Sequence, residues 1–197
     1  MAQPTTTFLD ELMDAARGCV ALLLGRRDAS GFFDFSQRGL VGSFIALVLG
    51  IGLTALGPQP LSAPAGTVTA GAAMAVVIFE GLIVAVQFGV AWLVLRQLGR
   101  GDGLVPFMVV QNWGILFQAI LAEFIILAFG PPIAVEGDVA QLTNGSLPLG
   151  ILAIMVFIIA INVGRLILTL RPLHVALFVG AQFGAMLVLP PLLGAFL

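Results

Sequence analysis

The sequence of 197 residues contains no lysine and no tyrosine, and only 9% of its residues are charged. A soluble domain usually carries about 25% charged residues, so this chain has too few of them to cover a surface in water. The same shortage excludes intrinsic disorder, which requires low hydrophobicity and high net charge. The net charge of −2 argues against a nucleic-acid partner, because such a partner favours a basic face.

Cysteine and histidine occur once each, as Cys19 and His174. A single cysteine excludes a disulfide scaffold, and a single histidine excludes H-E-x-x-H and similar metal sites. Without lysine there is no Walker-type phosphate loop, and none of the serines stands in a G-x-S-x-G setting. We therefore expect no enzyme, no catalytic residue, no metal and no cofactor. Cys19 fits a small buried hydrophobic residue, and His174 follows Arg171-Pro172 at a turn.

The chain is instead rich in long apolar runs, with 60% hydrophobic residues and a mean hydropathy of +1.14. A membrane helix needs roughly 20 mostly apolar residues, and five stretches satisfy this requirement. They cover residues 40–56, 72–95, 104–129, 147–170 and 173–197. Gly57-Pro58 and Gly130-Pro131-Pro132 follow two of them as stop signals. The pattern predicts an all-α, polytopic bundle of five transmembrane helices in one membrane domain, residues 40–197, since the alternation of a β-barrel is missing.

The basic residues predict the orientation of this bundle. All eight are arginines, and they lie before the first span, between spans two and three, and at the junction of spans four and five: Arg17, Arg26, Arg27, Arg38, Arg96, Arg100, Arg165 and Arg171. The other connecting segments contain none. Because positive residues stay on the cytoplasmic side, we expect the N-terminus inside and the C-terminus outside.

Residues 1–39 form a separate cytoplasmic segment in this prediction. Thr7 followed by Asp10 is typical of a helix N-cap with an acid in the first turn. Apolar residues then recur at helical spacing, at Phe8, Leu12, Ala15, Cys19 and Leu22. The stripe predicts an amphipathic helix that lies against the membrane interface or packs under the bundle.

Two acids lie inside the apolar runs, Glu80 in the second and Glu123 in the third. Counted from the outer ends of these antiparallel spans, both carboxyl groups fall at a similar depth. A charge at the bilayer centre costs on the order of 3 kcal/mol, so we expect both to face the bundle interior or water.

Side-chain amides extend this candidate polar site. The site comprises Glu80, Gln87, Asn112, Gln118, Glu123, Asn162 and Gln182, and Gln111 lies beside Gln118 on a neighbouring stripe. One interpretation is a pathway for a proton, an ion or a small solute. The other is a set of interhelical hydrogen bonds that stabilise the bundle by about 0.6 kcal/mol each. Gly180 and Gly184 form a G-x-x-x-G pattern, which permits close helix contact.

The architecture resembles the Yip (Ypt-interacting protein) domain family. Three segments carry the resemblance: Phe33-Asp34-Phe35-Ser36-Gln37-Arg38-Gly39 before span one, the Arg96–Gly103 connector, and Val109-Val110-Gln111-Asn112-Trp113 in span three. The resemblance implies a cytoplasmic N-terminal segment, five closely spaced helices and no catalytic residue. The chain lacks the tyrosines of the eukaryotic members, whose role with small GTPases is therefore not carried over. The use of arginine, glycine and alanine is typical of a GC-rich bacterial genome.

These observations predict a bacterial inner-membrane protein that acts through helix–helix contacts, as a scaffold, an accessory subunit or a membrane-organising factor. The alternative is a small transporter or channel component that uses Glu80 and Glu123 as an acid pair. The expected partners are the lipid bilayer and other membrane proteins or a second copy of the chain, and not nucleic acid.

Overall fold

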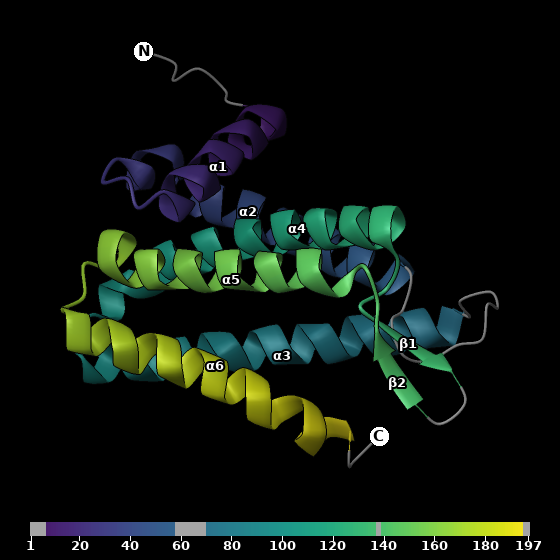
Figure 1. Ribbon diagram of the computed structural model, residues 1–197. Coiled ribbons are helices and arrows are strands. Elements are labelled where there is room, and N and C mark those ends of the chain that lie inside the picture. Colours follow the sequence, from purple (N-terminus) through teal and green to yellow (C-terminus); the bar gives the residue numbers. More distant parts are fainter. Residues whose placement is uncertain (1–6, 58–69, 137–138, 195–197) are drawn as a thin grey trace.

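The computed structural model describes residues 7–57, 70–136 and 139–194 and is built almost wholly of helices (Figure 1). In chain order the helices are α1 (Phe8–Leu23), α2 (Gln37–Leu56), α3 (Ala70–Gln97), α4 (Leu104–Phe129), α5 (Ser146–Asn162) and α6 (Pro172–Gly194). Short 3-10 helices cover Ala29–Phe32 and Gly101–Gly103, and a π-helical turn, Val163–Ile167, continues α5. The all-α class is confirmed.

Four of the described helices, α2 to α5 with their short extensions, are long and apolar enough to cross a membrane. Helix α6 is also apolar, but its apolar stretch, Pro172–Val188, is shorter than those four. The fifth span therefore stays a prediction, and residues 195–197 lie outside the described residues.

The predicted boundaries agree with the described helix ends to within a few residues. The third span was expected at 104–129, where α4 lies, and Gly130 ends it with a positive φ of 85°. The first span begins earlier than expected, because the Ser36 hydroxyl caps α2 by accepting from the Gly39 amide at 3.3 Å. The fourth span was predicted too long: the π turn ends at Ile167, and Thr169 has a φ of 48°.

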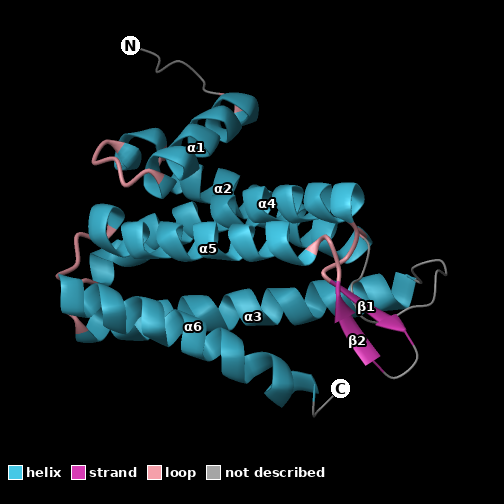
Figure 2. Ribbon diagram, in the orientation of Figure 1, coloured by secondary structure: helices cyan, strands magenta, loops and turns pink. Residues whose placement is uncertain are grey.

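The segment between α4 and α5 contains a hairpin that the sequence analysis missed (Figure 2). Strands β1 (Ile133–Glu136) and β2 (Val139–Leu142) pair antiparallel, with Ile133 opposite Leu142. Pro131 and Pro132 prevent the helix from continuing, and the Thr143 amide donates to the Pro132 carbonyl at 3.2 Å to close the base of the hairpin. The hairpin is a small addition to a helical protein.

Helices α2 and α4 form the most extensive pair and run parallel to each other. Ser43 lies beside Asn112, Gly50 beside Leu116, and Gly57 beside Glu123. A Cβ on Gly50 would lie 3.0 Å from the Leu116 Cα, so glycine is what allows the two backbones to approach this closely. Helices α3 and α6 form a second, antiparallel pair, which lies below α5 in the view of Figure 1.

Helix α1 is the amphipathic helix that the sequence predicts. Thr7 and Asp10 form a complete capping box, in which the Thr7 amide donates to the Asp10 carboxylate at 2.9 Å. The predicted stripe faces the bundle: Ala15 and Leu22 are buried, and Phe8, Leu12 and Cys19 pack against the same cluster. The helix contacts α2, α4 and α5, which agrees with a helix packed against the bundle.

The arginine-bearing connectors meet at one end of the bundle, which we call the arginine end (Figure 1). Arg100, between α3 and α4, donates to the Thr169 hydroxyl, between α5 and α6, at 2.8 Å. The 3-10 helix Ala29–Phe32 contacts the π turn that contains Arg165. The hairpin lies at the opposite end, the hairpin end. The segments that contain the arginines, which the positive-inside rule predicts on one side of a membrane, therefore lie together at one end of the fold.

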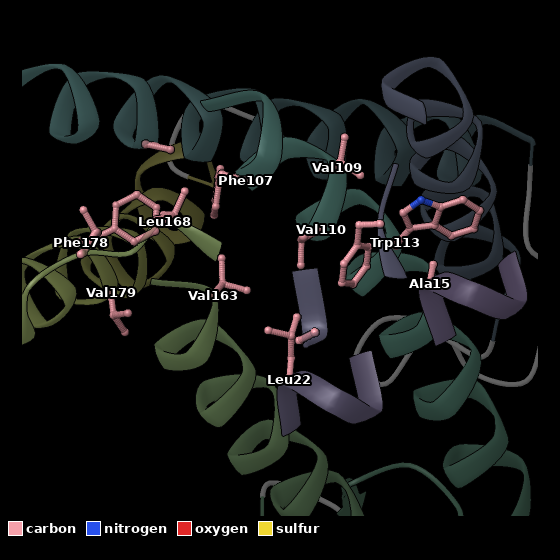
Figure 3. Packing of buried hydrophobic residues seen from close by; sticks show 14 of the residues in the cluster. Ala15, Leu22, Phe107, Val109, Val110, Trp113, Val163, Leu168, Phe178 and Val179 are labelled. Atoms are coloured by element: carbon pink, nitrogen blue, oxygen red, sulfur yellow. The ribbon is translucent and has the colours of Figure 1, made fainter. Parts of the chain in front are cut away.

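Figure 3 shows part of the main buried cluster. It joins Ala15 and Leu22 of α1 to Phe107 and Trp113 of α4 and to Phe178 of α6. A second, smaller cluster consists of Leu47, Ile51 and Val84. Large apolar side chains such as Val48 (68% exposed) and Leu127 (77% exposed) cover the outside. Exposed apolar surface on this scale is a mark of contact with a membrane or another protein.

Candidate functional site

Asn112 of α4 makes the most deeply buried polar contact between two helices. Its side-chain Nδ2 donates to the Ser43 hydroxyl of α2 at 3.0 Å, and Ser43 donates in turn to the Leu40 carbonyl at 2.8 Å. Both residues are inaccessible to solvent. The Asn112 Oδ1 accepts no hydrogen bond within the described residues. This pair therefore links α2 to α4 through buried side chains.

Gln182 and Gln87 connect a different pair of helices. The Gln182 Nε2 of α6 donates to the backbone carbonyl of Gln87 in α3 at 3.1 Å, and both residues are buried. Gln87 lies ten residues before the end of α3, and Gln182 ten residues after the start of α6. The contact thus lies in the middle of this antiparallel pair.

Asn162 lies at the arginine end, at the last residue of α5. Its Nδ2 donates to the Leu22 carbonyl of α1 at 2.8 Å, and its Oδ1 accepts weakly from Arg165 at 3.5 Å. Leu22 is in the last turn of α1, and its carbonyl also accepts from the Gly25 amide at 3.0 Å. Asn162 therefore adds a second hydrogen bond to this helix end and links α1 to α5. Asn162 thus lies near the arginine end, whereas Gln182 is ten residues into α6.

The two acids lie on different helices, and each lies on a face turned toward α2. The Glu123 carboxylate lies against Gly57 at the end of α2, where a Cβ on the glycine would overlap it. Glu80 is half-buried and lies one turn from Val84, on the face of α3 that packs against α2. Glu80 is ten residues from the start of α3, whereas Glu123 is six from the end of α4. No hydrogen bond or ion pair joins the two acids within the described residues.

The candidate polar residues are therefore distributed over the bundle and do not form one cluster. Gln118 has an exposed side chain, whereas Gln111 is half-buried. None of the seven candidates lines the cavity beside α1 and Trp113 or the groove between α5 and α6. Sequence reasoning missed Ser43 as a partner, although Ser43 and Thr54 are the two hydroxyl residues in the apolar run 40–56, and that signal could have identified it.

The remaining candidates behave as small structural residues. Burial raises the pKa of the Cys19 thiol to about 12, which leaves almost none of it as reactive thiolate at neutral pH. At Gly180 and Gly184 an added Cβ would meet nothing within 4 Å, so the G-x-x-x-G pattern makes no close contact inside the chain. Among the described residues, no group of three or more metal-ligating side chains could hold an ion.

Comparison with known proteins finds no family model, no curated protein and no solved structure that matches this chain. The resemblance to the Yip domain family thus stays a prediction based on the sequence segments given above.

Proposed function

We propose that this protein is a multi-pass protein of a bacterial inner membrane, of Yip-like type, that acts through contacts between helices as a scaffold, an accessory subunit or a membrane-organising factor. In this proposal five helices span the bilayer, and the arginine end lies in the cytoplasm. Helix α1 then lies at the cytoplasmic interface, where its exposed Asp14 and Arg17 side chains remain in water. The partners are lipid and other membrane proteins or a second copy.

The observation that carries the proposal is the separation of the buried amides into independent pairs. Asn112 is used between α4 and α2, Gln182 between α6 and α3, and Asn162 between α5 and α1. A pathway for protons or ions needs neighbouring polar groups along a wet cavity, since each intramembrane charge must be stabilised at every step. Amides that hold helix pairs together fit a structural role.

The alternative, a small transporter or channel component, depends on Glu80 and Glu123. Both acids belong to long apolar helices, which is the feature that favours it. Against it stand the lack of any hydrogen bond or ion pair between the two acids among the described residues, and their absence from the linings of the cavity beside α1 and of the groove between α5 and α6.

Purified protein in sealed vesicles that contain a pH-sensitive dye tests the two proposals against each other. After an imposed pH step, we expect proton entry equal to that of protein-free vesicles, for the wild type and for the double variant Glu80→Gln/Glu123→Gln. Faster entry in the wild type that the double variant abolishes would support the transporter and overturn the scaffold.

Purification in mild detergent tests the scaffold directly. We expect a membrane protein, or a second copy, to copurify in a fixed molar ratio that survives Glu80→Gln/Glu123→Gln. A monomer without any stoichiometric partner, measured by light scattering, would contradict the proposal.

A further inference from the structure

Helices α5 and α6 are consecutive, yet a groove of about 460 Å³ separates them on the outside of the bundle. Phe157, Ile161 and Arg165 line one wall at intervals of four residues, and Val175, Val179 and Gly180 belong to the other. Phe157 and Phe183 close one end with an edge-to-face ring contact, their centroids 5.1 Å apart. From Phe157 to Arg165 the helix rises about 12 Å. The groove is therefore a mostly apolar surface groove about this long, which runs along α5 and α6.

Arg165 is the one charged residue that lines this groove, and it lies at the arginine end of it. It takes part in none of the ion pairs found among the described residues. Among the described residues its side chain makes one long hydrogen bond, of 3.5 Å, to Asn162, so most of its donors are available. The π turn that carries Arg165 is a kind of helix irregularity that is frequent at functional sites.

We infer that this groove binds one anionic glycerophospholipid, with an acyl chain between α5 and α6 and the phosphate on the Arg165 guanidinium. The apolar walls match a hydrocarbon chain, and a guanidinium pairs with phosphate through two parallel hydrogen bonds. Basic positions between membrane helices on the cytoplasmic side are typical of anionic headgroup binding. The inference rests on the proposed membrane location of α5 and α6 and holds for a scaffold or a transporter.

Native mass spectrometry of the purified protein with added lipid tests this inference. The probes are phosphatidylglycerol and phosphatidylcholine with identical acyl chains, titrated separately onto wild-type protein and variants in detergent. Arg165→Gln removes the phosphate contact. Gly180→Leu fills the groove, since a Cβ on Gly180 meets nothing within 4 Å. Arg27→Gln and Gly184→Leu are matched controls: Arg27 is exposed, Gly184 also has open space, and neither lines the groove.

We expect the first phosphatidylglycerol to bind more tightly than the first phosphatidylcholine. Arg165→Gln should weaken phosphatidylglycerol alone by about fivefold, the usual contribution of one arginine to anionic lipid binding. Gly180→Leu should weaken both lipids, and both controls should bind like the wild type. Equal binding of the two lipids by the wild type would overturn the inference, as would equal losses in Arg165→Gln and Arg27→Gln. Because these titrations report no flux and no protein partner, their failure leaves the proposed function to its own tests.

Discussion

The Asn112 side chain donates a hydrogen bond to the Ser43 hydroxyl across 3.0 Å, at a point where neither residue is accessible. If this contact stabilises the α2–α4 pair, its coupling energy is measurable. In a double-mutant cycle with Asn112→Ala and Ser43→Ala, we expect a coupling of about 0.6 kcal/mol, with about 1.7 kcal/mol as the upper range for membrane proteins. Unfolding in a denaturing detergent titration gives the four stabilities. Additive effects of the two substitutions would contradict the assignment.

Gly50 should be intolerant of a side chain, whereas Gly52 on the same helix should accept one. A methyl group on Gly50 would press on the Leu116 backbone at 3.0 to 3.1 Å, but a Cβ on Gly52 meets nothing within 4 Å. We expect Gly50→Ala to lower the free energy of unfolding by about 1–3 kcal/mol, as overpacking does. Gly52→Ala should leave it unchanged or raise it by up to about 1 kcal/mol. Thermal unfolding followed by circular dichroism compares them, and equal effects would exclude close backbone contact as the cause.

Cys19 is a native reporter of whether α1 is attached to the bundle. Its buried thiol, with a pKa of about 12, should react slowly with iodoacetamide at neutral pH. Asn162→Ala removes the hydrogen bond to the Leu22 carbonyl at the end of α1, so we expect faster alkylation of Cys19, measured by mass spectrometry over time. The control Gln118→Ala changes an exposed amide. Rapid labelling of the wild type would show that α1 is not held as described.

The attachment of α1 should also depend on the ionisation of Glu11. Burial raises the pKa of this carboxyl group, Arg38 opposes the rise and Asp34 adds to it. A pKa raised in the folded state favours the neutral acid, so this contribution to stability is present below about pH 4.5. It is lost as the pH rises through the folded-state pKa. Hydrogen exchange of the α1 amides, corrected for the intrinsic effect of pH, should therefore show more protection under acidic conditions.

Glu11→Gln tests the sign of this effect. The variant keeps a neutral polar side chain at all pH values, so its α1 amides should be better protected than the wild type at pH 7 and lack this acid dependence. The lost ion pair with Arg38 is long, at 3.7 Å, and partly exposed, so it should matter little. Weaker protection in Glu11→Gln at pH 7 would mean that the ion pair outweighs the burial.

The sequence predicts the helices of this fold well because their signals are local. Thr7 and Asp10 indicate the start of α1, where they form a capping box. The run Gly130-Pro131-Pro132 ends α4 where expected. The hairpin after α4 could not be foreseen, since runs of four residues carry too little periodicity to be distinguished from a loop. Likewise, the early end of α5 depends on the π turn, which no residue type specifies.

The candidate site shows the limits of sequence reasoning about membrane helices. Spacing along one helix predicts which residues share a face, yet it says nothing about which helix that face meets. Asn112 meets Ser43 only because α2 lies beside α4, and Asn162 meets the Leu22 carbonyl only because α1 crosses α5. Such pairings depend on tertiary packing, which spacing along one helix does not specify.

The most direct test of the account is the side of the membrane on which the C-terminus lies. Alkaline phosphatase, active only outside the cytoplasm, and a fluorescent protein that folds only inside it are each fused behind Leu197 and expressed in bacteria. With five spans and the arginine end inside, the phosphatase fusion should be active and the fluorescent fusion dark. A bright fluorescent fusion with an inactive phosphatase fusion would contradict the five-span arrangement, and with it the assignment of the arginine end to the cytoplasm.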